Sequence, residues 1–315
     1  MSLSFGEEVQ KGLSSEPKYL SSKYFYNEKG DELFQEIMKM PEYYLTRSEY
    51  EVFTMHKEAI LNLFGKDGKP FQLIEFGAGD GLKTKVLLKH FLKRNASFKY
   101  HPIDISQNVL EELSADLGQN FPTLEVEPLN NEYFKALDTL DNTGEIRKAI
   151  LFLGSNIGNF QYDQAVSFLS QLAQKLSPED YLMVGFDLKK DPEAILNAYN
   201  DPHGITRAFN MNLLQRINNE LGGNFDTTNF KHWPIYDPLT GATKSYLVST
   251  KEQKVCIESL QQSFTFKAWE AIDMEISQKY DLETIGKLGA DAGLKVVKQL
   301  YDCKHYFVNT IFRRV

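Results

Sequence analysis

A glycine-rich segment flanked by acidic residues is the part of the chain best suited to binding chemistry. Residues 75–81 read EFGAGDG; they continue an apolar run and precede a helical stretch. Glycines at such a strand-to-helix turn let the backbone approach a ligand, because no side chain stands in the way. The beginning of the helix adds free N–H groups and a partial positive charge. The segment therefore predicts a cofactor-binding loop that contains Gly77 and Gly79.

An acidic residue at the end of the next predicted strand indicates a cofactor that carries a ribose. Asp104 ends the run 98–104, where its carboxylate can accept hydrogen bonds from both ribose hydroxyls. A nicotinamide dehydrogenase would use much the same geometry. An acidic residue followed by GxGxG nevertheless fits class I methyltransferases better than the GxGxxG pattern of dinucleotide sites. We therefore expect S-adenosylmethionine as the cofactor; the alternative is a glycine-rich turn without a ligand.

The elements that must position these residues alternate as in an α/β fold. Continuous apolar runs indicate strands that are covered on both faces, and they recur between helical stretches. Ser106 suits the N-cap of the helix after the second strand, because its hydroxyl can accept from a free helix N–H. The pattern predicts a doubly wound sheet of the class I methyltransferase type. Its candidate strands are residues 71–77, 98–104, 124–129, 148–155 and 180–188.

The remaining segments predict a second, smaller α+β domain. We expect residues 1–46 and a late insertion, residues 190–278, to form this substrate domain. Residues 47–189 and the C-terminal segment 279–315 then form the methyltransferase domain. The clearest elements of the insertion are a helix over residues 205–221 and strands over residues 245–250, 254–259 and 263–268.

Composition excludes several functional classes. The 315 residues are 42% hydrophobic and 13% aromatic, which suffices for a packed core, and the net charge of −8 argues against general nucleic-acid binding. No apolar run of about 18 residues and no export leader is visible, so we expect no membrane span and a cytoplasmic protein. Cys256 and Cys303 are too few for a disulfide framework, and the six histidines are too scattered to suggest a metal site.

Further blocks occur in a recognisable order from about residue 17 to the C-terminus. The most distinctive are PEYYLTR within residues 24–49 and LGSNIGN within residues 151–160. Through these blocks the chain resembles the histidine-specific Nα-methyltransferases of ergothioneine biosynthesis. The resemblance implies trimethylation of the α-amino group of L-histidine to hercynine, with S-adenosylmethionine as methyl donor. The other blocks are residues 73–88, 101–106, 185–191, 197–212 and 274–280.

The resemblance also implies which residues contact the cofactor. Gly77 and Lys83 match positions around the methionine part, and Asp104 matches the ribose-binding acid. Glu132 and Tyr133 stand where the family has an Asp-Phe pair beside adenine. The sequence NNEY departs there from the family's Gly-Asp-Phe pattern.

Substrate contacts follow from the same resemblance. The residues expected around histidine match three pairs of family positions: Tyr43 and Asn159 at the α-amine, Tyr26 and Tyr199 at the carboxylate, and Glu275 and Ser277 at the imidazole ring. Neutral Tyr and Asn groups can orient an amine without holding it as a paired ammonium, and a glutamate can accept from a ring N–H. By spacing alone, the tyrosines would instead be ordinary core residues.

Two alternatives remain open at this point. A methyltransferase of the same family could act on another aromatic amino acid or amine, since fungal relatives act on prenylated tryptophan. Ser245, which stands where the family has a methionine near the imidazole, could change the pocket wall. A cofactor-binding protein without turnover is the other alternative. We expect a monomer with a small-molecule substrate.

Overall fold

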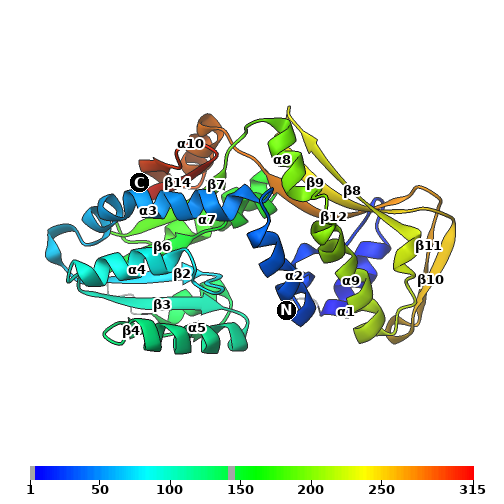
Figure 1. Ribbon diagram of the computed structural model, residues 1–315, viewed down its shortest axis with the longest axis horizontal. Coiled ribbons are helices and arrows are strands. Elements are labelled where there is room, and N and C mark those ends of the chain that lie inside the picture. Colours follow the sequence, from blue (N-terminus) through cyan, green and yellow to red (C-terminus); the bar gives the residue numbers. More distant parts are fainter. Residues whose placement is uncertain (1–3, 141–145) are drawn as a thin grey trace. The chain divides into compact units, whose positions relative to one another are not determined.

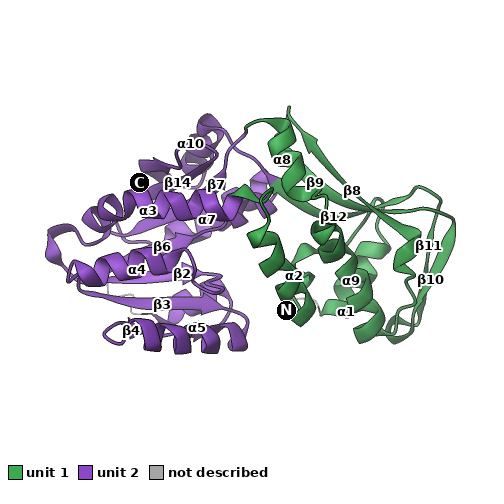
Figure 2. Cartoon of the chain, in the orientation of Figure 1, with its two compact units in different colours: residues 1–44, 190–277 green, residues 45–189, 278–315 purple. Residues whose placement is uncertain are grey.

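The computed structural model describes residues 4–140 and 146–315, and the chain forms two compact units (Figure 2). The first unit combines the residues up to Tyr44 with residues 190–277, and the second combines residues 45–189 with residues 278–315. The sequence predicted domain boundaries after residues 46 and 278, and the units divide after residues 44 and 277, one or two residues earlier. Each unit has its own hydrophobic core.

A mixed sheet forms the centre of the second unit (Figure 1). Its strands are β2 (Phe71–Phe76), β3 (Phe98–Asp104), β4 (Glu125–Val126), β5 (Leu129–Asn130), β6 (Arg147–Phe152), β7 (Tyr181–Asp187), β13 (Leu294–Tyr301) and β14 (Phe307–Arg314). They run in the order β13-β14-β7-β6-β2-β3-β4, with β5 also paired to β3. Strands β2 to β7 pair in parallel, whereas β14 is antiparallel to both β7 and β13.

The strand expected over residues 124–129 was wrong in extent. Two separate strands of two residues, β4 and β5, both pair with β3 at this place. Pro128 lies between them, and a proline has no N–H to donate to a sheet. The ends of the other four predicted parallel strands lie within three residues of the expected ends, and those of β3 match at both ends.

Helices cover both faces of this sheet, and each face has its own core cluster. The helices of the second unit are α3 (Tyr44–Phe64), α4 (Thr84–Lys93), α5 (Gln107–Asn120), α6 (Tyr133–Thr139), α7 (Tyr162–Lys175) and α10 (Leu282–Asp291), with short 3₁₀ turns η2 (Lys66–Gly68) and η3 (Asn156–Asn159). Neighbouring residues of β2 belong to the clusters on opposite faces. Leu73 belongs to the cluster with residues of α3, α4 and α5, and Ile74 to the cluster with residues of α6, α7 and α10. Burial of both faces explains the continuous apolar runs and confirms the doubly wound arrangement.

The first unit contains a four-stranded sheet, a hairpin and four helices among its described residues. The sheet strands are β1 (Lys18–Tyr19), β8 (Phe230–Asp237), β9 (Ala242–Ser249) and β12 (Ala271–Gln278), in the order β1-β12-β9-β8. The other elements are α1 (Phe5–Leu13), η1 (Ser22–Tyr24), α2 (Glu28–Lys39), α8 (Pro192–Tyr199), α9 (Ile205–Leu221), η4 (Thr227–Asn229), β10 (Gln253–Ile257), η5 (Glu258–Leu260) and β11 (Gln262–Phe266).

Side chains supplied by the local sequence set the first turns of several helices. The Asn27 side chain accepts from the Gly30 N–H at 2.9 Å where α2 begins, and Asp281 accepts from the Thr284 N–H at 2.8 Å at the beginning of α10. Ser106 caps α5 by accepting from the Val109 N–H at 3.4 Å, which confirms the predicted cap. Each cap satisfies a backbone donor that has no partner inside its helix.

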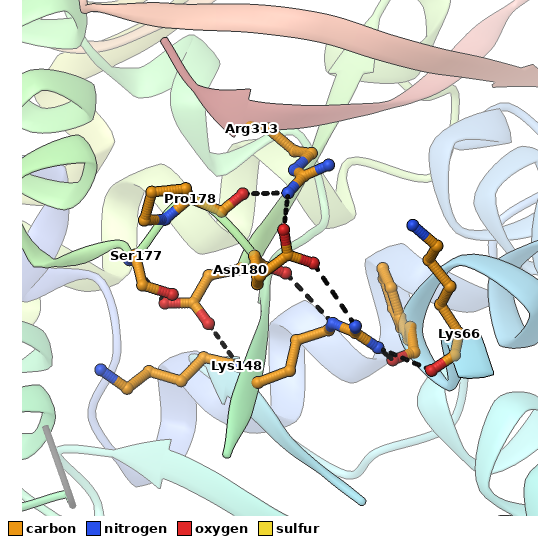
Figure 3. Close-up of polar contacts among 9 residues, drawn as sticks. Lys66, Lys148, Ser177, Pro178, Asp180 and Arg313 are labelled. Atoms are coloured by element: carbon orange, nitrogen blue, oxygen red, sulfur yellow. Dashed lines mark hydrogen bonds and ion pairs between the residues drawn. The ribbon is translucent and has the colours of Figure 1, made fainter. Parts of the chain in front are cut away.

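A polar network ties together the amino ends of β6 and β7 (Figure 3). The Asp180 carboxylate accepts from the backbone N–H groups of Lys148 and Ser177, each at 2.7 Å. Arg313 donates to the Pro178 carbonyl and pairs with Glu179 at 3.0 Å. The network lies at the opposite edge of the sheet from the glycine-rich segment, which follows the carboxyl end of β2.

A buried ion pair holds the segments at which the chain leaves and re-enters the second unit. Lys279 and Asp187 are fully buried, and the Lys279 ammonium lies 2.8 Å from the Asp187 carboxylate. Leu188 and Tyr280 form a parallel bridge beside it, and the Tyr280 N–H donates to the Asp187 carbonyl at 2.9 Å. The ion pair is therefore shielded from water where residues 187–188 meet residues 279–280.

No helix within the described parts of the chain is long and apolar enough to cross a membrane. Across residues 4–140 and 146–315, no group of three or more His, Cys, Asp or Glu side chains is arranged to hold a metal ion. Cys256 and Cys303 are exposed and free.

We predict that Lys279→Met destabilises the protein strongly. The substitution leaves the buried Asp187 carboxylate without its ammonium partner, which typically costs about 3–5 kcal/mol in unfolding free energy. Replacing both residues, with Asp187→Leu beside Lys279→Met, should cost less than the sum of the two single changes, because no unpaired charge then remains buried. Urea denaturation of the three variants measures this; additive losses would contradict it.

Candidate active site

Three parallel strands end level with one another at one edge of the sheet in the second unit. Phe76, the last residue of β2, pairs with Ile103 of β3 on one side and with Phe152 of β6 on the other. The segments that follow these strands therefore begin at the same edge. In open α/β sheets this edge, at the place where the strand order changes direction, is where ligands bind.

The glycine-rich loop after β2 has the backbone shape that the sequence predicted. Gly77, Gly79 and Gly81 have φ angles of +65°, +53° and +64°, a region that side chains with a Cβ rarely adopt. The Gly77 N–H donates to the Ile103 carbonyl at 2.8 Å, which joins the loop to the end of β3. A Cβ on Gly77 would also lie 3.0 Å from the Tyr133 hydroxyl.

Asp104 lies beside this loop. Its Oδ2 atom is 3.4 Å from the Gly79 N–H that donates to it, and its Oδ1 atom accepts from the Ser106 N–H at 3.0 Å. The Asn130 side chain donates to the Asp104 backbone carbonyl at 3.1 Å. The carboxylate is only partly buried, so it keeps acceptor capacity for the hydroxyls of a ligand.

Glu132 and Tyr133 differ sharply in their surroundings. The Tyr133 ring stacks on Phe76, with centroids 4.6 Å apart, and burial together with the nearby Asp104 charge raises the pKa of Tyr133 to about 12. Tyr133 therefore remains a hydroxyl donor beside Gly77. Glu132 is exposed and pairs with Lys135 at 2.9 Å, a contact that lowers the pKa of Glu132. Tyr133 thus lies against the glycine-rich loop, whereas the Glu132 carboxylate pairs with Lys135 at the surface.

A buried carboxylate anchors the beginning of the loop. Glu75 accepts hydrogen bonds from the Thr84 hydroxyl at 2.7 Å and from the Tyr100 hydroxyl. Burial raises the pKa of Glu75 to about 7, although both hydrogen bonds oppose that shift. These contacts join the end of β2 to the first residue of α4 and to β3, so they fix the two ends of the glycine turn.

Lys83 is held by a residue that sequence reasoning did not single out. Its ammonium pairs with Glu49 of α3, and the same Glu49 oxygen accepts from the Gly154 N–H at 2.9 Å. Glu49 lies in the recognised block 24–49, but no role was expected for it. A signal was available: Glu49 shares a helix face with Leu45 and Phe53, and a charged residue on an apolar face requires a partner.

The loop after β6 carries Asn159 and is strained and well anchored. Gly154 and Ser155 have φ angles of +71° and +58°, and the Ser155 hydroxyl accepts from the Asp187 N–H at 3.1 Å. A Cβ on Gly158 would lie 2.9 Å from the Gln278 carbonyl, so only glycine fits there. Asn159 itself is exposed at the end of η3, which follows the carboxyl end of β6.

In the first unit, two predicted substrate residues contact each other directly. The Tyr199 hydroxyl donates to the Ser277 hydroxyl at 2.8 Å, and both residues are buried. Glu275 precedes Ser277 by two positions on β12 and is half-buried. Glu275 and Ser277 are therefore not an exposed pair on a surface strand.

The two remaining tyrosines lie around a common ring. The Phe34 ring centroid is 5.5 Å from that of Tyr26 and 6.4 Å from that of Tyr43, both with edge-on geometry. Tyr26 is 45% exposed, so its ring is not an ordinary core side chain. Ser245 on β9 is almost fully buried, and its hydroxyl has no hydrogen-bond partner among the described residues.

Comparison with known proteins decides the family. Residues 5–314 match the family described as histidine-specific, S-adenosylmethionine-dependent methyltransferases. The chain belongs to this family. It is 33% identical over 288 residues to a histidine N-alpha-methyltransferase of Mycolicibacterium smegmatis, a match that covers 91% of this chain and 88% of that protein.

Two fungal relatives extend the comparison. The methyltransferase is 31% identical over 286 residues to ergothioneine biosynthesis protein 1 of Schizosaccharomyces pombe, covering 85% of this chain and 37% of that longer protein. It is 25% identical over 311 residues to a 4-dimethylallyltryptophan N-methyltransferase of Claviceps purpurea, covering 92% of this chain and 89% of that protein. The chain is therefore similar to proteins named for different amino-acid substrates.

S-adenosylmethionine is the methyl donor of this methyltransferase, and the second unit suits it. The cofactor is a nucleoside joined to an amino acid, and three features suit it. Gly77 leaves space that a Cβ would fill, Asp104 offers acceptor oxygens, and the Lys83 ammonium is partly exposed. The sheet order, the glycine turn and the acid at the end of β3 agree with the predicted class I methyltransferase fold.

We predict that Glu75 makes the stability of this methyltransferase depend on pH. Since burial raises the pKa of Glu75 to about 7, the folded protein keeps a proton there that the unfolded chain loses near its usual 4.5. Between these values the folded state binds more protons, so stability falls as the pH rises, and the effect is complete above pH 7.

Glu75→Gln lacks this titration. The unfolding free energy of the variant minus that of the parent protein should therefore increase from pH 4.5 to 7, by at most about 1.4 kcal/mol per pH unit. Urea denaturation at several pH values measures the difference, and a difference that stays constant with pH would rule this out.

Proposed function

We propose that this methyltransferase trimethylates the α-amino group of L-histidine to give hercynine, and that it consumes three S-adenosylmethionine molecules for each histidine. The observation that carries the proposal is the polar set on β12 and α8, in which Tyr199 bonds to Ser277 and Glu275 lies on the same strand. Such a set suits an amino acid with a polar ring, because imidazole offers both an N–H donor and a ring nitrogen acceptor, whereas indole offers only an N–H donor. The family description supports the same substrate.

The chemistry asks little of the protein beyond alignment and desolvation. S-adenosylmethionine already carries the electrophilic methyl group, so transfer is an in-line displacement by the amine. The amine must be uncharged and aimed at that methyl. In the proposed roles, Tyr43 and Asn159 hydrogen-bond to the amine; neither carries a charge that would hold it as an ammonium.

The remaining roles concern recognition of the substrate. Tyr26 and Tyr199 donate hydroxyl hydrogen bonds to the substrate carboxylate, and Glu275 with Ser277 binds the imidazole ring. A substrate without a ring N–H would lack the hydrogen bond to the Glu275 carboxylate, and a hydrogen bond to a charged group is typically worth about 1.5–3 kcal/mol. On the cofactor, the proposal assigns Gly77, Gly79 and Lys83 to the methionine part, Asp104 to the ribose, and Tyr133 with Glu132 to the adenine region.

A second candidate is N-methylation of another aromatic amino acid or amine. Ser245 is the observation that favours it, because a small, buried residue with an unpartnered hydroxyl stands where the family has a methionine near the ring. The fungal relative named for dimethylallyltryptophan shows that related sequences carry other substrate names. The exposed, free cysteines suit a reducing compartment, so we also propose a cytoplasmic location; the expected monomer remains a prediction.

Mass spectrometry of reactions with S-adenosylmethionine and single amino acids tests the proposal. We expect a gain of three methyl groups on histidine and no product from alanine or tryptophan. Methylated tryptophan with unreacted histidine would overturn the roles of Glu275 and Ser277 and favour the second candidate. Absence of any product, together with tight cofactor binding, would favour a binding protein without turnover.

Two substitutions should separate the substrate and cofactor contacts. Glu275→Ala should weaken histidine binding by about tenfold or more and change cofactor binding little, because it removes a charged hydrogen-bond acceptor. Asp104→Ala should do the reverse, since it removes the acceptor for the ribose hydroxyls. Isothermal titration calorimetry with histidine and with S-adenosylhomocysteine measures both affinities. Equal losses in both variants would show that the two sets of contacts are not separate.

A further inference from the structure

We infer that Glu49 is a positioning residue for the methionine end of the cofactor. Glu49 is fully buried, whereas the Lys83 side chain that it pairs with remains 20% exposed. The Glu49 carboxylate therefore cannot touch a ligand itself. It can act on a ligand only by orienting the Lys83 ammonium, which is exposed enough to reach the ligand. The inference rests on the proposed assignment of Lys83 to the methionine part of S-adenosylmethionine.

Glu49 joins two segments that come from neighbouring strands. Its Oε2 atom accepts from the Lys83 ammonium, which follows the glycine-rich loop after β2, and from the Gly154 N–H, which follows β6, at 2.9 Å. A Cβ on Gly154 would lie 3.5 Å from the Lys83 nitrogen, so the ammonium lies against that second loop as well. One carboxylate oxygen thus fixes the distance between the two loops at the ligand-binding edge of the sheet.

The Glu49 carboxylate reduces the stability of the surrounding sheet. A Cβ on Gly185, in the interior of β7, would lie 2.5 Å from Glu49 Oε1, so any larger residue at this position must displace that carboxylate. Glycine weakens a strand interior. Moreover, Glu49 Oε1 is buried and has no hydrogen-bond partner in the described parts of the chain. A buried carboxylate with an unused oxygen destabilises the fold, so its contribution lies in orienting Lys83 and Gly154.

Two ligands separate positioning from general stability. S-adenosylhomocysteine contains the amino-acid part of the cofactor, and 5′-methylthioadenosine lacks it but keeps the adenosine. Glu49→Gln should weaken binding of S-adenosylhomocysteine by about tenfold, the change expected when one hydrogen bond to a charged group is lost. Binding of 5′-methylthioadenosine should stay within about twofold, because Asp104 and Tyr133 are untouched. Calorimetric titration of the full chain measures both.

Asp180→Asn is the matched control. Asp180 is also a buried carboxylate of the second unit that accepts two hydrogen bonds, but it lies at the amino ends of the strands (Figure 3). This variant should lose stability and bind both ligands as the parent protein does. Gly185→Ala provides an independent route, since its Cβ must displace the Glu49 carboxylate; it should show the same selective loss as Glu49→Gln.

Lys83→Met separates the two ways in which the idea can fail. If Lys83→Met weakens S-adenosylhomocysteine binding and Glu49→Gln does not, the positioning role of Glu49 is wrong and the assignment of Lys83 stands. If Lys83→Met leaves S-adenosylhomocysteine binding unchanged, the assignment of Lys83 and the role of Glu49 both fall. Equal losses of both ligands in Glu49→Gln, or tighter binding of S-adenosylhomocysteine, would also overturn the inference.

Discussion

The hydrogen-bond register of β2 between its two parallel neighbours governs the cofactor side of this protein. Phe76 is level with Ile103 and with Phe152, so three segments distant in sequence begin at one edge of the sheet. The glycine turn, Asp104 and the Gly154 loop follow directly from these three strand ends. A shift of one residue in either pairing would move a loop along the edge and turn the side chains of its strand to the opposite core.

Buried carboxyl groups then fix the positions of the loops that follow these strands. Glu75 joins the end of β2 to α4 and β3 through two hydroxyl donors, and Glu49 joins the Lys83 segment to the Gly154 loop. Asp180 does the same for backbone N–H groups at the amino ends of β6 and β7. Carboxyl groups suit this work because each of their two oxygens can accept a hydrogen bond. The price is desolvation, which is visible in the raised pKa of Glu75.

The candidate substrate residues of the first unit are mostly neutral hydroxyls and aromatic rings. The Tyr199–Ser277 hydrogen bond and the rings of Tyr26 and Tyr43 around Phe34 provide oriented donors and acceptors with little charge. Such an environment suits an amine that must lose its proton before it can accept a methyl group. In the proposed function, the Glu275 carboxylate accepts from a ring N–H. Imidazole and indole can both donate one, so the choice between histidine and another aromatic amino acid depends on the few atoms around that donor.

The sequence by itself determined four of the parallel strands, the glycine turn, the Ser106 cap and the family, because each depends on local spacing or on blocks that can be read in order. Only the tertiary structure revealed the antiparallel β14, the division of the strand around Pro128 and the different surroundings of Glu132 and Tyr133. It also revealed the role open to Glu49. Helical periodicity could have indicated that Glu49 is buried, but its partners lie 34 and 105 residues further along the chain. Local patterns record which face of an element is buried; which side chains meet there is decided by the packing of elements far apart in the sequence.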